Sequence, residues 1–175
     1  KVEADVSDGL PSFTMVGLPS TQVKEAQDRV RTALKNNGIA LPPKRITVNL
    51  APADIRKEGA GFDLPLAAAV LAAAGVLSAE QLGNVMMAGE IGLNGEIHAV
   101  SGILPMIIRA REEKCRFCVV PYDNLKEAHL IPDMKVIGVA DLQEMIRYVS
   151  APDSYKKAVE TGKKSPQENS VDFCE

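Results

Sequence analysis

The sequence predicts a single α/β domain in which helices pack against a mixed sheet and one apolar helix is buried. Short runs of alternating apolar and polar residues are separated by segments whose apolar residues recur at helical spacing. The segment Leu64–Gly75 is apolar on all sides, as expected of a helix that is covered all round. The 46% hydrophobic and 25% charged content of the 175 residues is enough for one sizeable core.

The first half of the chain predicts a hairpin, a helix and a strand. Two alternating runs within Val2–Val16 are separated by Asp8-Gly9-Leu10-Pro11, which is turn chemistry between antiparallel strands. The helix that follows has Ser20 as its candidate N-cap and Gly38 as its stop. Arg45–Leu50 alternates as a strand and leads toward a glycine-rich turn at the start of the apolar helix.

The second half predicts another hairpin, followed by helices and strands in alternation. Val85–Ile91 and Glu96–Val100 flank an Asn-Gly pair, which favours a tight turn between antiparallel strands. A helical stripe of apolar residues covers Ile103–Ala110. The remaining predicted elements are two strands, each followed by an amphipathic helix: Phe117–Val120 with Asn124–Leu130, and Lys135–Val139 with Leu142–Val149.

The composition changes after Ala151, where lysine, glutamate, serine, glutamine and asparagine dominate. Few of these residues can be buried, so we expect a domain over residues 1–150 and a tail and linker over 151–175. The terminal Val171-Asp172-Phe173 is interpreted as the first part of a further packed segment. Because the sequence opens at Lys1 without a methionine, we expect a piece of a longer protein.

Charge, cysteine content and hydropathy restrict the class of protein. A net charge of -3 argues against non-specific coating of nucleic acid, which needs a basic face. Three cysteines, an odd number, indicate a reducing compartment, and we expect a cytoplasmic protein. No apolar run reaches the roughly 20 residues needed to span a bilayer, so no membrane partner is expected.

The turn Lys57–Asp63 is the first candidate site. A glycine-rich turn that enters a helix presents main-chain N–H groups, which favours binding of an anion such as phosphate. Against this, Asp63 occupies the expected N-cap position, where its carboxylate would accept those N–H groups and repel a phosphate. We therefore favour a structural turn, with Gly59 and Gly61 for the tight bend and Asp63 as the cap. The chain has no P-loop motif.

Other residue patterns give no catalytic or metal site. Cys115 and Cys118 form a C-x-x-C pair, but no second pair of ligands follows at zinc spacing, and the pair enters a strand rather than a helix. A strand cysteine is the favoured interpretation. His98 and His129 are isolated, and no serine lies in a nucleophile-elbow motif. We therefore expect neither a catalytic residue nor a metal ligand.

Four basic residues bracket the strand Arg45–Leu50: Lys44, Arg45, Arg56 and Lys57. They are the candidate contact residues, because grouped at one end of the sheet they would form a patch for DNA phosphates. Solvated strand ends are the alternative, which the acidic net charge favours.

Three stretches together carry a resemblance to a known family. They are Val2–Pro11 with Val16-Gly17-Leu18-Pro19, Arg45–Pro52 running into Arg56-Lys57-Glu58-Gly59, and Gly89–Glu96. Over about Val2–Val149 the sequence resembles the N-terminal domain of the ComM/YifB-type magnesium-chelatase-like proteins, which belong to the AAA+ ATPases. The resemblance implies a Lon-protease-like fold and an AAA+ ATPase domain following the tail.

The resemblance also locates the positions of the Ser-Lys pair in Lon-type peptidases. Aligning the glycine-rich turn puts Gly61 at the serine position, and aligning the second hairpin puts Leu104 at the lysine position. Glycine has no nucleophilic atom and leucine cannot take a proton. The resemblance therefore implies a domain that is not a peptidase.

For the longer protein, the resemblance implies a hexameric ring-forming ATPase that acts on branched or single-stranded DNA during recombination or DNA uptake. ATP and magnesium are expected only in the ATPase domain, and no cofactor in this segment. The segment itself would serve ring assembly or recognition of branched DNA. The alternative is a phosphate or nucleotide binder, since small-molecule kinases of similar fold use a glycine-rich turn. Porphyrin metallation, suggested by the family's chelatase label, finds no support in these residues.

Overall fold

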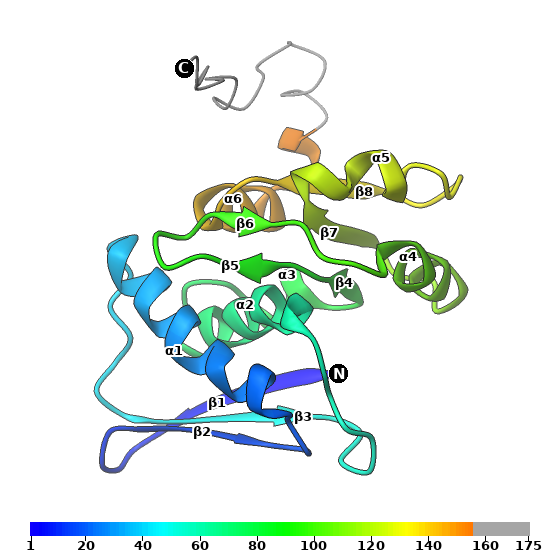
Figure 1. Ribbon diagram of the computed structural model, residues 1–175. Coiled ribbons are helices and arrows are strands. Elements are labelled where there is room, and N and C mark those ends of the chain that lie inside the picture. Colours follow the sequence, from blue (N-terminus) through cyan, green and yellow to red (C-terminus); the bar gives the residue numbers. More distant parts are fainter. Residues whose placement is uncertain (156–175) are drawn as a thin grey trace, which may run out of the picture.

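The computed structural model describes residues 1–155 of the chain (Figure 1). The predicted polar tail therefore lies outside the described residues from residue 156 onward. In chain order the elements are β1 (Val2–Ser7), β2 (Ser12–Val16), α1 (Thr21–Asn36), β3 (Arg45–Leu50), η1 (Ala60–Phe62), α2 (Asp63–Ala73), α3 (Ala79–Leu82), β4 (Val85–Met87), β5 (Glu90–Ile91), β6 (Ile97–His98), α4 (Ile103–Glu112), β7 (Phe117–Pro121), η2 (Tyr122–Asn124), α5 (Leu125–Ala128), β8 (Val136–Val139) and α6 (Leu142–Ser150).

The predicted first hairpin is wrong, because β1 and β2 do not pair with each other. The sheet has the order β1-β3-β2, with β3 antiparallel to β1 and parallel to β2. The turn after β1 reverses the chain as predicted, but α1 then carries it back so that β3 enters between the two strands. β3 takes the central place because Ile46, Val48 and Leu50 give it a fully buried face.

Helix α1 begins and ends where the sequence predicts. The Ser20 hydroxyl accepts a hydrogen bond from the N–H of Val23 at 3.3 Å, which caps the first turn. Gly38, with φ +75°, follows the last turn in the left-handed conformation. The helix packs its apolar stripe against α2.

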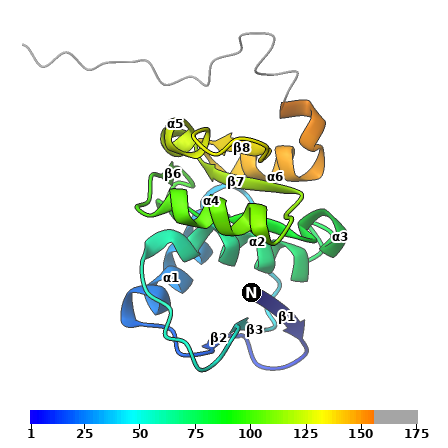
Figure 2. The same cartoon turned by 90° about the vertical axis from the view of Figure 1, so that its right-hand side faces the viewer.

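Helix α2 is the buried centre of the fold. It lies between α1 and the β1-β3-β2 sheet on one side and the second half of the chain on the other (Figures 1 and 2). Leu64, Leu66, Val70 and Leu71 have no exposed surface. The prediction of a buried helix is confirmed for most of its surface, but Pro65 and Ala69 are only half-buried. The helix ends at Ala73 rather than Gly75.

The second sheet has the order β4-β7-β8, with all strands parallel. Helices cover both of its faces: the core cluster on one face includes residues of α2 and α6, and the cluster on the other face includes residues of α4 and α5. The strands and helices predicted after Ile103 are confirmed, except that the predicted helix Asn124–Leu130 is reduced to η2 and the short α5.

The second predicted hairpin is partly wrong. Val85–Met87 joins the parallel sheet, and only β5 and β6 pair antiparallel around the predicted turn. The chain changes sheet at Gly89, where a Cβ atom would lie 3.1 Å from Ile97 Cγ2 and 3.2 Å from Leu64 Cδ2. Glycine is needed there because the strand crosses the start of α2 at close range.

The helix α3 was not predicted, although its start has a recognisable signal. Ser78 and Gln81 form a capping box, in which each side chain bonds the other's main-chain N–H. Among the described residues, no helix is long and apolar enough to cross a membrane.

Candidate functional site

The glycine-rich turn is held at its start by Lys57. The main chain of Lys57 makes two hydrogen bonds with the segment that follows β2. Its N–H donates to the Leu18 carbonyl at 3.1 Å, and its carbonyl accepts from the Ser20 N–H at 2.9 Å. Its side chain is buried, and its ammonium donates to the Pro52 carbonyl. Lys57 was predicted as an exposed contact residue, and this placement corrects that expectation: its charge anchors the loop inside the protein.

The predicted role of Asp63 as N-cap is also wrong. Asp63 is the first residue of α2, and its carboxylate turns away from the helix start. It accepts hydrogen bonds from Arg29 Nε at 2.8 Å, from Arg29 NH2 at 2.9 Å and from the Ile91 N–H at 3.1 Å. The side chain has no exposed surface. A carboxylate buried this deeply needs a charged partner, and Arg29 supplies it.

The Arg29–Asp63 pair joins three elements, because α1 supplies the arginine, α2 the aspartate and β5 the third hydrogen bond. The hydrogen bond to Asp63 raises the pKa of Arg29 above its ordinary value, and the charges of Glu90 and Glu25 contribute further. The sequence contains a weak signal for this partner: Arg29 lies beside the buried stripe of α1, three residues after Ala26.

The start of α2 offers few donors to a phosphate, although the Asp63 carboxylate is turned away from it. The Asp63 N–H donates to the Ala60 carbonyl, and the Leu64 N–H donates to the Gly89 carbonyl at 3.0 Å. The third helical residue is Pro65, which has no N–H. The first turn of the helix is therefore already satisfied by the protein itself.

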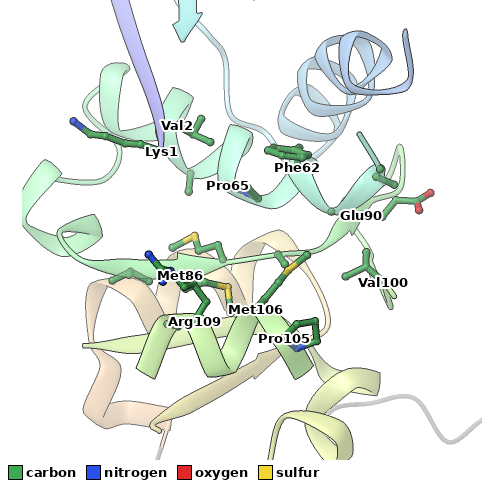
Figure 3. A pocket seen from close by; sticks show the side chains of 18 of the residues that line it. Lys1, Val2, Phe62, Pro65, Met86, Glu90, Val100, Pro105, Met106 and Arg109 are labelled. Carbon is green, nitrogen blue, oxygen red and sulfur yellow. The ribbon is translucent and has the colours of Figure 1, made fainter. Parts of the chain in front are cut away.

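The turn borders an open cleft of about 1070 Å³ between α2 and α4 (Figure 3). β4 runs along its base, and Gly61 and Val100 line the end nearest the turn. A Cβ atom added at Gly61 would meet only Val100 Cγ2, at 3.9 Å. Gly61 therefore lines the cleft at a position that has room for a side chain.

The other edge of the cleft is fixed by two polar side chains. Asn124 binds Val100 twice, accepting from its N–H and donating to its carbonyl, both at 3.0 Å. Glu127 accepts from the Leu104 N–H at 3.2 Å and so occupies the start of α4. Leu104, which the resemblance aligns with the peptidase lysine, lies in the first turn of α4 with its N–H bonded to Glu127.

The cysteine pair fits the predicted structural interpretation. Cys118 lies buried in β7, and burial raises its pKa to about 12. Cys115 is half-buried in the lining of the cleft, where burial, with a smaller contribution from Glu113, also raises its pKa. Both thiols are therefore protonated near neutral pH and are weak nucleophiles. Within residues 1–155, no group of histidine, cysteine or acidic residues is placed to hold a metal.

The basic residues do not form the single patch that the sequence suggested. Lys44 and Arg45 lie at the start of β3, whereas Arg56 and Lys57 lie beyond its end. At about 3.3 Å per strand residue, the two pairs are about 20 Å apart. Lys44 pairs with Asp8 at 2.9 Å, and Arg56 pairs with Glu58 at 3.0 Å. The expected grouping of the four basic residues at one end of the sheet is therefore wrong, because β3 separates the two pairs and Lys57 is buried.

The chain is similar in sequence to a known family and to several known proteins. The family model of subunit ChlI of Mg-chelatase matches residues 2–124. Competence protein ComM of Haemophilus influenzae is 42% identical over 164 residues, which cover 94% of this chain and 32% of ComM. YifB of Escherichia coli is 48% identical over 130 residues, which cover 74% of the chain and 26% of YifB.

A more distant relative supports the fold. Lon protease 2 of Bacillus subtilis is 27% identical over 128 residues, which cover 72% of this chain and 22% of the protease. With the mixed α/β architecture described above, this places the domain in the Lon-protease-like class. The chain spans about a third of the length of ComM, so it corresponds to one segment of a larger protein.

Proposed function

We propose, from the premise that this chain belongs to the family of subunit ChlI of Mg-chelatase, that it is a non-catalytic N-terminal domain of a larger AAA+ ATPase. Its role is ring assembly or recognition of branched DNA in recombination or DNA uptake. The observation that carries the proposal is the cleft with Gly61 at its edge, since the resemblance aligns this glycine with the serine of the Lon-type peptidases and glycine has no nucleophilic atom. The name of the relative ComM, a competence protein, supports the link to DNA uptake.

Of these two roles, the positions of the basic residues favour assembly over direct DNA contact. Counterion release needs several phosphates bound along one face, whereas Lys44 and Arg56 are engaged by acidic neighbours at opposite ends of β3. Two apolar residues on segments that adjoin the turn are exposed instead. Leu18 is 56% exposed and Ile55 is 57% exposed, on two segments that are hydrogen-bonded to each other at Lys57. Exposed apolar groups of this kind suit a protein contact.

In the intact protein, ATP and magnesium would bind in the part that follows this domain, and the assembled form would be a cytoplasmic hexameric ring. Deleting residues 1–151 from the full-length protein tests the proposal. We expect the deletion to lower the fraction of hexamer in sedimentation velocity and the rate of processing of a forked DNA. Unchanged hexamer formation and unchanged DNA processing would refute it, and activity on a porphyrin instead of DNA would redirect it.

Direct DNA contact by these residues can be detected in the salt dependence of DNA binding. Changing Lys44, Arg45 and Arg56 together to alanine leaves the salt dependence of DNA binding unchanged if the domain serves assembly. If the three side chains bind phosphates, the slope of log K against log salt becomes shallower by about 0.9 for each phosphate that the variant no longer neutralises. Fluorescence anisotropy with a forked DNA over a salt series distinguishes the two outcomes.

The substitution Gly61→Ser tests the missing nucleophile. Because the position is not left-handed and has space for a side chain, we expect the free energy of unfolding to change by less than about 1 kcal/mol. We expect no peptidase activity above that of the unaltered chain, since Leu104 cannot activate the serine. Hydrolysis of a fluorogenic peptide by this variant would show that another group serves as the base.

A further inference from the structure

The parallel sheet ends at β4, although the helices that cover it extend past this edge. Among residues 1–155, β4 pairs only with β7. The Ala88 N–H donates to the Val119 carbonyl at 3.2 Å, so Met86 and Ala88 turn their main-chain groups toward β7. Residues of a parallel strand alternate in this respect. Val85 and Met87 therefore direct their N–H and C=O groups away from the sheet, into the cleft.

The two walls of the cleft lie on opposite faces of this sheet. Pro65 and Ala69 of α2 form one wall, and Pro105 and Met106 of α4 form the other, with Met86 between them (Figure 3). Met106 is 39% exposed, although it is apolar. A slot with unpaired main-chain groups at its base and apolar walls on both sides has the shape of a place for one more strand.

Both ends of the slot carry acidic side chains. Near the turn, Glu90 lines the cleft; its charge acts on Arg29, but among the described residues it makes no ion pair within 4 Å. At the far end, the Arg109 guanidinium is held by Glu112 and Glu113. The turn end therefore presents the Glu90 carboxylate, and at the far end two carboxylates surround a single guanidinium, which leaves that end acidic as well. A bound group with a positive charge would be favoured beside Glu90.

We propose that this slot binds an extended peptide, which adds to β4 as a further strand with small apolar side chains against α2 and α4 and a basic residue toward Glu90. An extended backbone fits this edge because its own main-chain groups can pair with those of Val85 and Met87. Apolar walls and a free carboxylate disfavour nucleic acid. Two copies of the chain cannot pair through β4, since each edge lies recessed between two helices. This inference does not depend on the proposed assembly role.

The test uses the 175-residue chain and fluorescent hexapeptides of alternating valine and threonine, about 20 Å long when extended. One carries a lysine at its amino end and the other at its carboxyl end. We expect one of them to bind with a micromolar Kd. The end of the peptide that must carry the lysine then shows whether the peptide runs parallel or antiparallel to β4. Binding should also slow amide hydrogen exchange at Met87. If neither peptide binds, the proposal is overturned.

Peptides methylated on the main-chain nitrogens separate strand pairing from general apolar capture. Methyl groups on one alternating set of residues block the N–H groups that face β4, and methyl groups on the other set do not. We expect the first peptide to bind at least about tenfold more weakly than the parent, as for the removal of one or two hydrogen bonds, and the second to bind like the parent. Equal affinity of the two peptides would refute the strand model.

Protein variants give the complementary test. Met87→Pro removes an N–H that faces the slot and leaves the bonds to β7 in place, as a proline on an edge strand can. Met106→Arg fills the slot from an exposed position, so it serves where the proline variant fails to fold. Both should weaken binding about tenfold, whereas Leu10→Arg, at a residue 85% exposed in the first turn, should not. Full binding by Met106→Arg would place the peptide elsewhere.

Discussion

Replacing Arg29 by methionine is expected to lower the free energy of unfolding by about 3–5 kcal/mol. Asp63 has no exposed surface and accepts two of its three hydrogen bonds from the Arg29 guanidinium. Without the arginine, a carboxylate remains buried with only the Ile91 N–H as donor, or must take up a proton. Urea denaturation of the 175-residue chain, followed by circular dichroism, measures the loss.

The control is Arg31→Met, an exposed arginine of the same helix, for which a change within about 0.5 kcal/mol is expected. Adding Asp63→Asn to Arg29→Met should recover much of the stability, because the amide removes the buried charge and still accepts from the Ile91 N–H. If Arg29→Met cost no more than Arg31→Met, the pair would not hold α1, α2 and β5 together as described.

The elements that the sequence predicts well are those whose signal is local. Ser20 and Gly38 mark the two ends of α1, because capping and the left-handed stop depend on a few neighbouring residues. The buried α2 follows from apolar residues on every side of the helix. These properties are determined within one or two turns of chain, so no knowledge of distant contacts is needed.

The errors of prediction concern pairing between distant segments. The turn at Asp8–Pro11 predicts a reversal of the chain, but it cannot tell that β3 enters between β1 and β2. The continuous apolar run from Val85 to Ile91 hides a change of sheet, and only Gly89 marks it. Strand order depends on which faces are buried together, and this is a property of the whole fold.

The candidate site shows the same division. The assignment of Gly61 to the serine position of a peptidase concerns one residue and its alignment, and it stays a prediction. The roles of Asp63 and Lys57 depend on burial: Asp63 is paired with a residue 34 positions away, and Lys57 turns its charge inward to Pro52. Without tertiary contacts, a carboxylate at a helix start and a lysine in a loop are naturally interpreted as a cap and an exposed contact.

Replacing Gly17 by alanine is expected to lower the free energy of unfolding by about 3 kcal/mol, as the sum of two costs. The residue has φ +97°, a conformation that costs an L-residue about 1–2 kcal/mol. An added Cβ would also clash with the Leu50 carbonyl oxygen. That atom belongs to the central strand and cannot move freely, so overpacking adds about 1–3 kcal/mol. Denaturant unfolding of the purified variant checks the value.

Gly38→Ala separates these two costs. Gly38 also has a left-handed backbone, with φ +75°, but no atom lies within 4 Å of its added Cβ. It should therefore lose only about 1–2 kcal/mol, and the difference between the variants measures how closely β2 approaches the end of β3. Equal losses would mean that the approach at Leu50 relaxes without cost. A larger loss of stability for Gly17→Ala would show that residue 17 must be glycine because its backbone packs closely against Leu50. This close packing also positions Leu18, whose carbonyl accepts the hydrogen bond from the Lys57 N–H at the start of the turn.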